Sequence, residues 1–274
     1  NVDLVGTTSY EQVIARVVER ARNTPKGEWI IGRGWDQNDW GDTRFPTHEA
    51  LTRAVPDHPV YLTRVDGHAA LANAMAMQKA NVTKASTDPS GGSIARDAAG
   101  DPAGVFVDNA QGLVGRAIPA PTRAQTKDAI KAAIAEMHRY GMTGVHDAGA
   151  SQLVVELYEE LGRESALDIR LYAMISDNAA AIDALIRRGP QSGLHHGMLW
   201  LRSIKLYQDG ALGSRGAALL EPYSDDAKTN GLLVSAPAHI QEVATRALKA
   251  GIQVNTHAIG DRGNRLVLDS YEAA

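Results

Sequence analysis

The sequence contains no cysteine among its 274 residues. Disulfide bonds, thiolate metal sites and cysteine nucleophiles are therefore excluded. A bound metal ion would have to be held by histidine, carboxylate or modified lysine side chains. The absence of cysteine fits both a reducing and an oxidising compartment, so the sequence leaves open whether the protein is cytoplasmic or exported.

Long apolar runs and clusters of basic residues are also missing. No segment approaches the roughly 18 consecutive apolar residues that a membrane helix needs. The formal net charge is -4, and without a Lys/Arg cluster nothing favours binding to nucleic acid or to an anionic membrane. The composition, 44% hydrophobic and 22% charged, is typical of a soluble globular protein. We therefore expect a small-molecule substrate as partner, and a homo-oligomer is compatible with these features.

The second half of the chain alternates predicted helices and strands in a regular order. Each predicted helix is followed closely by an apolar, β-branched segment, and the helices are at 123–140, 152–161, 179–188 and 239–250. Four helix-to-strand repeats indicate parallel strands with crossover helices. A barrel is favoured over a doubly wound sheet because no strand end carries a glycine-rich dinucleotide fingerprint.

The first part of the chain is less regular. Residues 1–27 predict a short strand and a helix that begins with a capping box of Ser9 and Gln12, and we assign them to the start of the barrel. Residues 28–121 combine short strand candidates, two short helices and a hairpin-like pair, which predicts an inserted α+β subdomain. Residues 122–274 would then supply barrel strands about two to five with their helices.

Two predicted strand ends carry residues suited to chemistry. Reactive groups in parallel barrels lie at the carboxyl ends of the strands, where the strand-to-helix loops form the mouth of the site. Lys205 lies between Ile204 and Leu206 in an apolar strand, and a buried ammonium is costly unless it is paired or neutralised. An ion pair with Asp209, use as a Schiff-base amine, or a carbamate that binds metal would each relieve this cost.

His257 follows the strand segment IQVNT and precedes AIGDRG. Its imidazole would project at the rim of the sheet, which suits a metal ligand, an acid–base group or a purely structural histidine. His146 and Asp147 end another predicted strand. Adjacent strand residues point to opposite faces, and we favour Asp147, which is nearer the end, as the residue that faces the site.

Five longer motifs run in order along nearly the whole chain. They are GRGWDQNDW (32–40), PVYLTRVDGHAALAN (59–73), GMTGVHDAG (141–149), IKLYQDGALGSR (204–215) and NTHAIGDRGNRLVLDSYE (255–272). Together they resemble the amidohydrolase superfamily, and within it the branch that includes the N-substituted formamide deformylases. Any one motif would be weak evidence, whereas five in the right order are strong evidence.

The resemblance implies a TIM-type (β/α)8 barrel that holds one or two divalent metal ions, commonly zinc. Its ligands are a His-x-His pair after the first strand, a lysine (often carboxylated) or glutamate after the fourth, histidines after the fifth and sixth, and an aspartate after the eighth. Lys205 falls on the fourth position and His257 on the fifth, so both are expected metal ligands and catalytic residues. Neither a His-x-His pair nor the later motifs occur in this sequence, so we expect a partial barrel that lacks part of its active site.

The implied reaction is hydrolysis of carbon–nitrogen bonds other than peptide bonds, in amide, formamide or cyclic amide small molecules, by a metal-activated water. Two alternatives stay open: a metal-free barrel aldolase or lyase in which Lys205 forms a Schiff base, and a non-catalytic binding barrel. Packing or solvation accounts equally well for the six candidate substrate contacts. These are Trp35, Asp36, His68, Asp147, Asp209 and Arg215.

Overall fold

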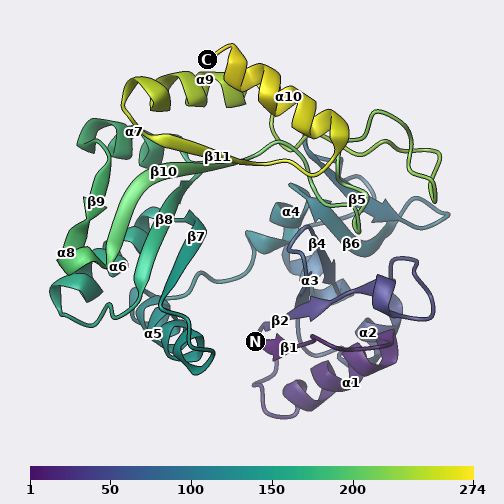
Figure 1. Ribbon diagram of the computed structural model, residues 1–274. Helices are drawn as coiled ribbons and strands as arrows, with labels where there is room; N and C mark the ends of the chain where they lie inside the picture. Colours follow the sequence, from purple (N-terminus) through teal and green to yellow (C-terminus); the bar gives the residue numbers. More distant parts are fainter. The chain divides into compact units, whose positions relative to one another are not determined.

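The computed structural model describes all residues, 1–274, and the chain folds into two compact units. Unit 1 comprises residues 1–119, 209–234 and 259–263. Unit 2 comprises residues 120–208, 235–258 and 264–274. Figure 1 labels the helices and strands of both units, each of which is described by itself.

Unit 1 is built on a six-stranded mixed sheet with the order β1-β2-β3-β4-β6-β5. The first three strands are parallel, and the remaining neighbours are antiparallel. Tight turns can join only antiparallel neighbours, which explains the change of direction after the third strand. The strands are β1 (Val2–Asp3), β2 (Ile30–Trp35), β3 (Val60–Arg64), β4 (Ala69–Ala72), β5 (Gly92–Arg96) and β6 (Pro102–Asp108).

Residues 1–27 fold in one unit with residues 28–119. The physical reason is that β1 pairs in parallel with β2, and that helix α1 (Tyr10–Ala21) buries Val13 and Val17 in the core of the same unit. The Ser9 side chain accepts from the Gln12 backbone N–H, while the Gln12 side chain accepts from Thr8. The further helices of unit 1 are η1 (Gln37–Asp39), α2 (His48–Ala54), α3 (Ala74–Lys79) and α4 (Gln111–Gly115).

Unit 2 contains four parallel strands in the order β11-β10-β8-β7, with β9 (Gln191–Gly193) attached to β10 as a short antiparallel strand. The parallel strands are β7 (Gly144–Ala150), β8 (Arg170–Ser176), β10 (Leu199–Tyr207) and β11 (Gln253–His257). The helices are α5 (Arg123–Arg139), α6 (Gln152–Arg163), α7 (Ala179–Arg188), α8 (Leu194–Gly197), α9 (Pro237–Lys249) and α10 (Asp261–Glu272), whose first turn belongs to unit 1.

Helices cover one face of this parallel sheet (Figure 1). Leu201 and, beyond the register shift between Leu201 and Ser203, the alternate residues Ile204 and Leu206 are buried there with Leu161 of α6 and Ile240 of α9. Burial of each such side chain stabilises the fold by roughly 1.5–3 kcal/mol. The intervening residues of the strands, Lys205 among them, project to the other face.

We expected part of a TIM-type barrel, and the structure shows an α/β fold without a closed barrel. The strands are divided between a mixed sheet in unit 1 and an open parallel sheet in unit 2, in which β7 and β11 are edge strands. Closure requires every strand to have two neighbours, and these two have one each. The fold is therefore α/β with a partly parallel architecture. None of its helices is long and apolar enough to cross a membrane.

Candidate functional site

Lys205 projects from β10 onto the face of the unit 2 sheet that lies opposite the helices. Its ammonium donates to the Leu206 carbonyl at 3.0 Å and lies 3.6 Å from the centre of the Tyr207 ring. Burial alone lowers the pKa of Lys205 to about 8, and no carboxylate contributes to the shift. The cost of burying the Lys205 ammonium is therefore not offset by an ion pair.

His257 shares that face with Lys205. On the adjacent strands β10 and β11, Lys205 lies opposite Asn255, and Tyr207 lies opposite His257. Paired residues of neighbouring strands point to the same face, and so do residues two apart in one strand. The Tyr207 and His257 rings are 5.5 Å apart between centroids. Tyr207 therefore contacts both predicted metal ligands.

His146, rather than Asp147, lies on the face with Lys205. The Asp147 side chain accepts a hydrogen bond of 2.7 Å from Tyr158 of helix α6. Burial of Tyr158, together with the negative charge of Asp147, raises the pKa of Tyr158. His146 instead stacks on Tyr172, with ring centroids 5.0 Å apart. The strand register explains this arrangement. Asp147 lies opposite Ala173, which is buried, so the Asp147 side chain points to the face that the helices cover. The preference for Asp147 rested on its position along the strand, which does not determine the face.

Two other predicted contact residues lie at a buried arginine in unit 1. Trp35 is fully buried, and its indole N–H donates to the Leu62 carbonyl at 2.7 Å, which is a packing position. Asp36 forms an ion pair with Arg64, whose side chain is 2% exposed. Arg64 also pairs with Asp66 and donates to Gln37 Oε1 at 2.8 Å.

His68 forms a close pair with Asp108 in unit 1. Its Nδ1 lies 2.6 Å from the Asp108 carboxylate, and this hydrogen bond raises the pKa of His68 against the opposing effect of burial. Asp66 and Asp209 add to the increase. The three carboxylates of Asp108, Asp66 and Asp209 thus favour the imidazolium form of His68.

This pair predicts a pH-dependent contribution to stability. The pKa of His68 is higher in the folded than in the unfolded state, so its contribution is fully present below the unfolded value of about 6.5. It is lost as the pH rises through the folded pKa. Denaturant titrations of wild type and His68→Asn at several pH values should show a difference in unfolding free energy that shrinks with rising pH. A pH-independent difference would contradict the assignment.

Asp209 and Arg215 are held within unit 1 by contacts of their own. The fully buried Asp209 carboxylate accepts from three backbone N–H groups, those of Ala218, Ile259 and Gly260, at 2.8–2.9 Å. Arg215 has a left-handed backbone, φ +58°, and donates to Asp225 at 2.8 Å. Asp209 therefore joins residues 209–218 to residues 259–260. Roles in substrate contact stay predictions for both residues.

Comparison with known proteins decides the family. The amidohydrolase family matches residues 2–274, nearly the whole chain. The chain belongs to the amidohydrolase family. The resemblance of the five motifs is thereby confirmed.

Named relatives of this amidohydrolase chain come from several organisms. YtcJ of Bacillus subtilis (strain 168) is 33% identical over 99% of the chain and 51% of its own length. N-substituted formamide deformylase of Arthrobacter pascens is 27% identical over 97% of the chain and 50% of its own length. The crystal structure of a metal-dependent hydrolase from Pyrococcus horikoshii superimposes with a TM-score of 0.68 at 29% identity, over 99% of this chain and 52% of the other. The chain thus spans about half the length of the curated relatives it matches.

The amidohydrolase chain offers two candidate metal donors on one face, Lys205 and His257. No group of three or more histidine, aspartate or glutamate side chains is arranged to hold a metal ion. A neutral imidazole binds a metal directly, whereas an ammonium has no free lone pair, so Lys205 could be a ligand only in carboxylated form. The two residues fit part of a coordination shell.

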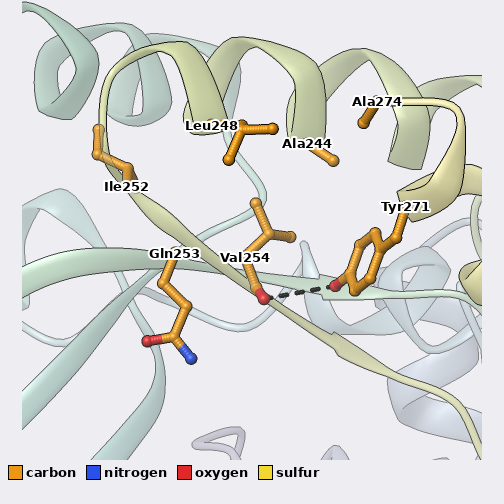
Figure 2. A pocket seen from close by; sticks show the side chains of 7 residues that line it. All are labelled: Ala244, Leu248, Ile252, Gln253, Val254, Tyr271 and Ala274. Atoms are coloured by element: carbon orange, nitrogen blue, oxygen red, sulfur yellow. Dashed lines mark hydrogen bonds between the residues drawn. The ribbon is translucent and has the colours of Figure 1, made fainter.

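A pocket of unit 2 lies on the other side of β11. It has a volume of about 250 Å³ and an apolar lining (Figure 2). The Val254 side chain points into it, while the Gln253 amide points away from it. The pocket is therefore separate from the face that carries Lys205. Its lining residues are Ala244, Leu248, Ile252, Gln253, Val254, Tyr271 and Ala274.

Sequence reasoning did not single out Tyr207 or Asn255. Both stand two residues from a predicted ligand, so the two-residue period of a strand would have placed them on the same face. The Tyr207 hydroxyl lies 3.4 Å from the Ala148 carbonyl, and the Ser176 hydroxyl donates to Gly149 at 2.6 Å. These bonds link β10 and β8 to β7 at the carboxyl edge of the sheet.

Proposed function

We propose that this chain forms part of a metal-dependent hydrolase that cleaves carbon–nitrogen bonds other than peptide bonds in small amides, formamides or cyclic amides. One observation carries the proposal: Lys205 and His257 project from adjacent parallel strands onto one face, close to the carboxyl ends of these strands. Family membership and the metal-dependent hydrolase of similar structure support it. The same proposal includes a small molecule as the substrate, and no binding to nucleic acid or to a membrane.

In this proposal, a carboxylated Lys205 and the neutral imidazole of His257 hold a divalent ion, with zinc as our choice. When bound, the ion polarises the scissile carbonyl and activates the attacking water. Tyr207 restricts both side chains because its ring contacts the Lys205 ammonium and the His257 ring. The buried Ile204 and Leu206 anchor this part of β10 to the helices. For the full-length gene product we propose a (β/α)8 barrel, to which these four parallel strands would contribute.

Metal analysis of the full-length gene product tests the proposal. We expect about one or two divalent ions per chain in the wild type, and loss of bound metal in Lys205→Met and in His257→Asn. The controls His138→Asn and Lys131→Met change the same residue types at exposed positions of helix α5 and should retain the metal. Wild-type protein that binds no divalent ion and hydrolyses no amide would overturn the proposal. Metal retention in both test variants would overturn the ligand assignment.

A Schiff-base lyase is the second candidate function, favoured by the pKa of Lys205. A value of about 8 leaves part of the amine neutral near physiological pH, as nucleophilic attack on a carbonyl requires. Borohydride reduction in the presence of carbonyl compounds, followed by peptide mass spectrometry, separates the two functions. An adduct on Lys205 whose formation is independent of added metal would favour the lyase.

A further inference from the structure

Three glycines recur at every third position in one loop of unit 1. They are Gly210, Gly213 and Gly216 in the segment GALGSRG, residues 210–216, which we call the glycine loop. None of the three has a positive φ, so the backbone conformation at these positions would accept alanine. A requirement for glycine here therefore comes from the neighbouring groups.

A buried charged side chain of unit 1 lies next to each of these glycines. A methyl group added at Gly213 would come closer than 3.0 Å to the guanidinium of Arg64. Methyl groups at Gly210 and Gly216 would come closer than 3.0 Å to the carboxylate of Asp108. The side chains of Arg64 and Asp108 are only 2% and 3% exposed. Glycine thus allows the loop backbone to reach two buried charges of opposite sign.

Arg64 is held in one orientation against the glycine loop. Its Nε donates to Gln37 Oε1 at 2.8 Å, and Gln37 Nε2 donates to the Gly213 carbonyl at 3.1 Å. Asp36 and Asp66 form ion pairs with the two Nη atoms of the guanidinium. Because the guanidinium is planar and is bound through all three of its nitrogens, it cannot turn away from Gly213 without losing these bonds.

Asp108 is fixed on the other side of the loop by its own backbone and by His68. It is the last residue of β6 and has a left-handed backbone, φ +48°, which is uncommon for a residue other than glycine. Its N–H donates to the His68 carbonyl at 2.9 Å, and its carboxylate lies 2.6 Å from His68 Nδ1. These contacts direct the carboxylate against Gly210 and Gly216.

Apolar packing does little to hold the glycine loop in place. Its two apolar side chains are Ala211, which is buried, and Leu212, which is 55% exposed. Backbone hydrogen bonds inside the loop close it on itself, but they do not determine where it lies. Its position therefore depends on the contacts with Arg64 and Asp108, together with the Asp209 anchor that precedes the loop.

We propose that Arg64 and Asp108 are positioning residues that fix the glycine loop for the hydrolysis proposed above. Buried ion pairs are often no more stabilising than apolar side chains of similar volume, whereas a planar, fully bound guanidinium orients its neighbours. The loop begins five residues after Lys205, so we expect a displaced loop to disturb the carboxyl end of β10. This catalytic consequence rests on the proposed function, whereas the fixing of the loop does not.

A double-mutant cycle in the full-length gene product tests the contact with Arg64. Hydrogen exchange measured by mass spectrometry reports on peptides that contain residues 210–216. Gly213→Ala should speed their exchange at least about tenfold, because the added methyl group displaces the guanidinium. Lysine lacks the Nη atoms that this methyl group meets, so in an Arg64→Lys background Gly213→Ala should add less than about twofold.

A second cycle tests Asp108 independently. Gly216→Ala should speed exchange in the wild type, and it should be tolerated in an Asp108→Gly background, where glycine accepts the left-handed backbone and no carboxylate meets the methyl group. The control is Gly41→Ala. Gly41 is exposed, has no positive φ and has nothing within 4 Å of an added methyl group, so this variant should exchange like the wild type.

Kinetics separates this inference from the proposed function. In Gly213→Ala, kcat for a small formamide should fall at least about tenfold, with KM and bound metal within about twofold of the wild type. If both glycine substitutions act equally with and without their charged neighbours, Arg64 and Asp108 do not position the loop. Faster exchange with unchanged kcat would overturn the catalytic part. A wild-type protein without metal or hydrolysis would instead contradict the proposed function, and the exchange cycles would still decide whether the two side chains fix the loop.

Discussion

The variant His257→Ala is expected to lower kcat/KM of the full-length gene product for a small formamide by at least about 10³-fold, or ~4 kcal/mol. The imidazole lies on the same face as Lys205 and against the Tyr207 ring. Alanine removes the one proposed ligand that binds a metal without prior modification. Steady-state kinetics with and without added Zn²⁺ would measure the effect.

The control for this experiment is His138→Asn, at an exposed position near the end of helix α5. It should keep wild-type kinetics, and circular dichroism should show that both variants are folded. A loss of less than about tenfold in His257→Ala, ~1.4 kcal/mol, would contradict the assignment of His257 as a ligand.

The variant Asp209→Ala is expected to lower the free energy of unfolding by about 3–5 kcal/mol. The fully buried carboxylate accepts from the backbone N–H groups of Ala218, Ile259 and Gly260. Alanine leaves all three donors without this acceptor, in a place where Gly263 already approaches the carboxylate closely. Asp209→Asn keeps one acceptor oxygen and should lose less. Urea denaturation followed by circular dichroism would measure both effects.

A neighbouring carboxylate provides the control for Asp209. The Asp225 side chain is 62% exposed and pairs with Arg215, and an exposed ion pair contributes up to about 1 kcal/mol. Asp225→Ala should therefore change stability little. If Asp209→Ala were no more destabilising than Asp225→Ala, the bonds to residues 259 and 260 would not hold this part of unit 1 together.

Local patterns predicted the helices and strands of unit 2. The segments after residue 122 alternate in helical and strand character, and the structure has parallel strands at Gly144–Ala150, Arg170–Ser176, Leu199–Tyr207 and Gln253–His257. Their prediction succeeded because apolar periodicity and helix caps depend on residues within a few positions of one another. The prediction of Lys205 and His257 as site residues rested on the same local patterns. These patterns show where a strand ends, and therefore which residues lie at its carboxyl end.

Such local patterns could not predict which distant segments of the chain pair with one another. Nothing in residues 1–27 shows that Val2 pairs with Gly32 and so joins this segment to the sheet of unit 1. Asp209 looked like a strand-end residue beside Lys205, yet its carboxylate binds backbone groups about 50 positions later in the chain. Position along the strand favoured Asp147 over His146, whereas only pairing with β8 determines which of them meets the helices.

The sequence by itself determined the family, the parallel character of residues 122–274, and the two residues expected to act as ligands. The tertiary structure alone decided that both sheets are open, and that Tyr207 contacts both Lys205 and His257. The physical reason is a difference in range. Strand periodicity and strand ends are local, whereas the face that a side chain occupies and the partners it finds depend on register between strands far apart in the chain.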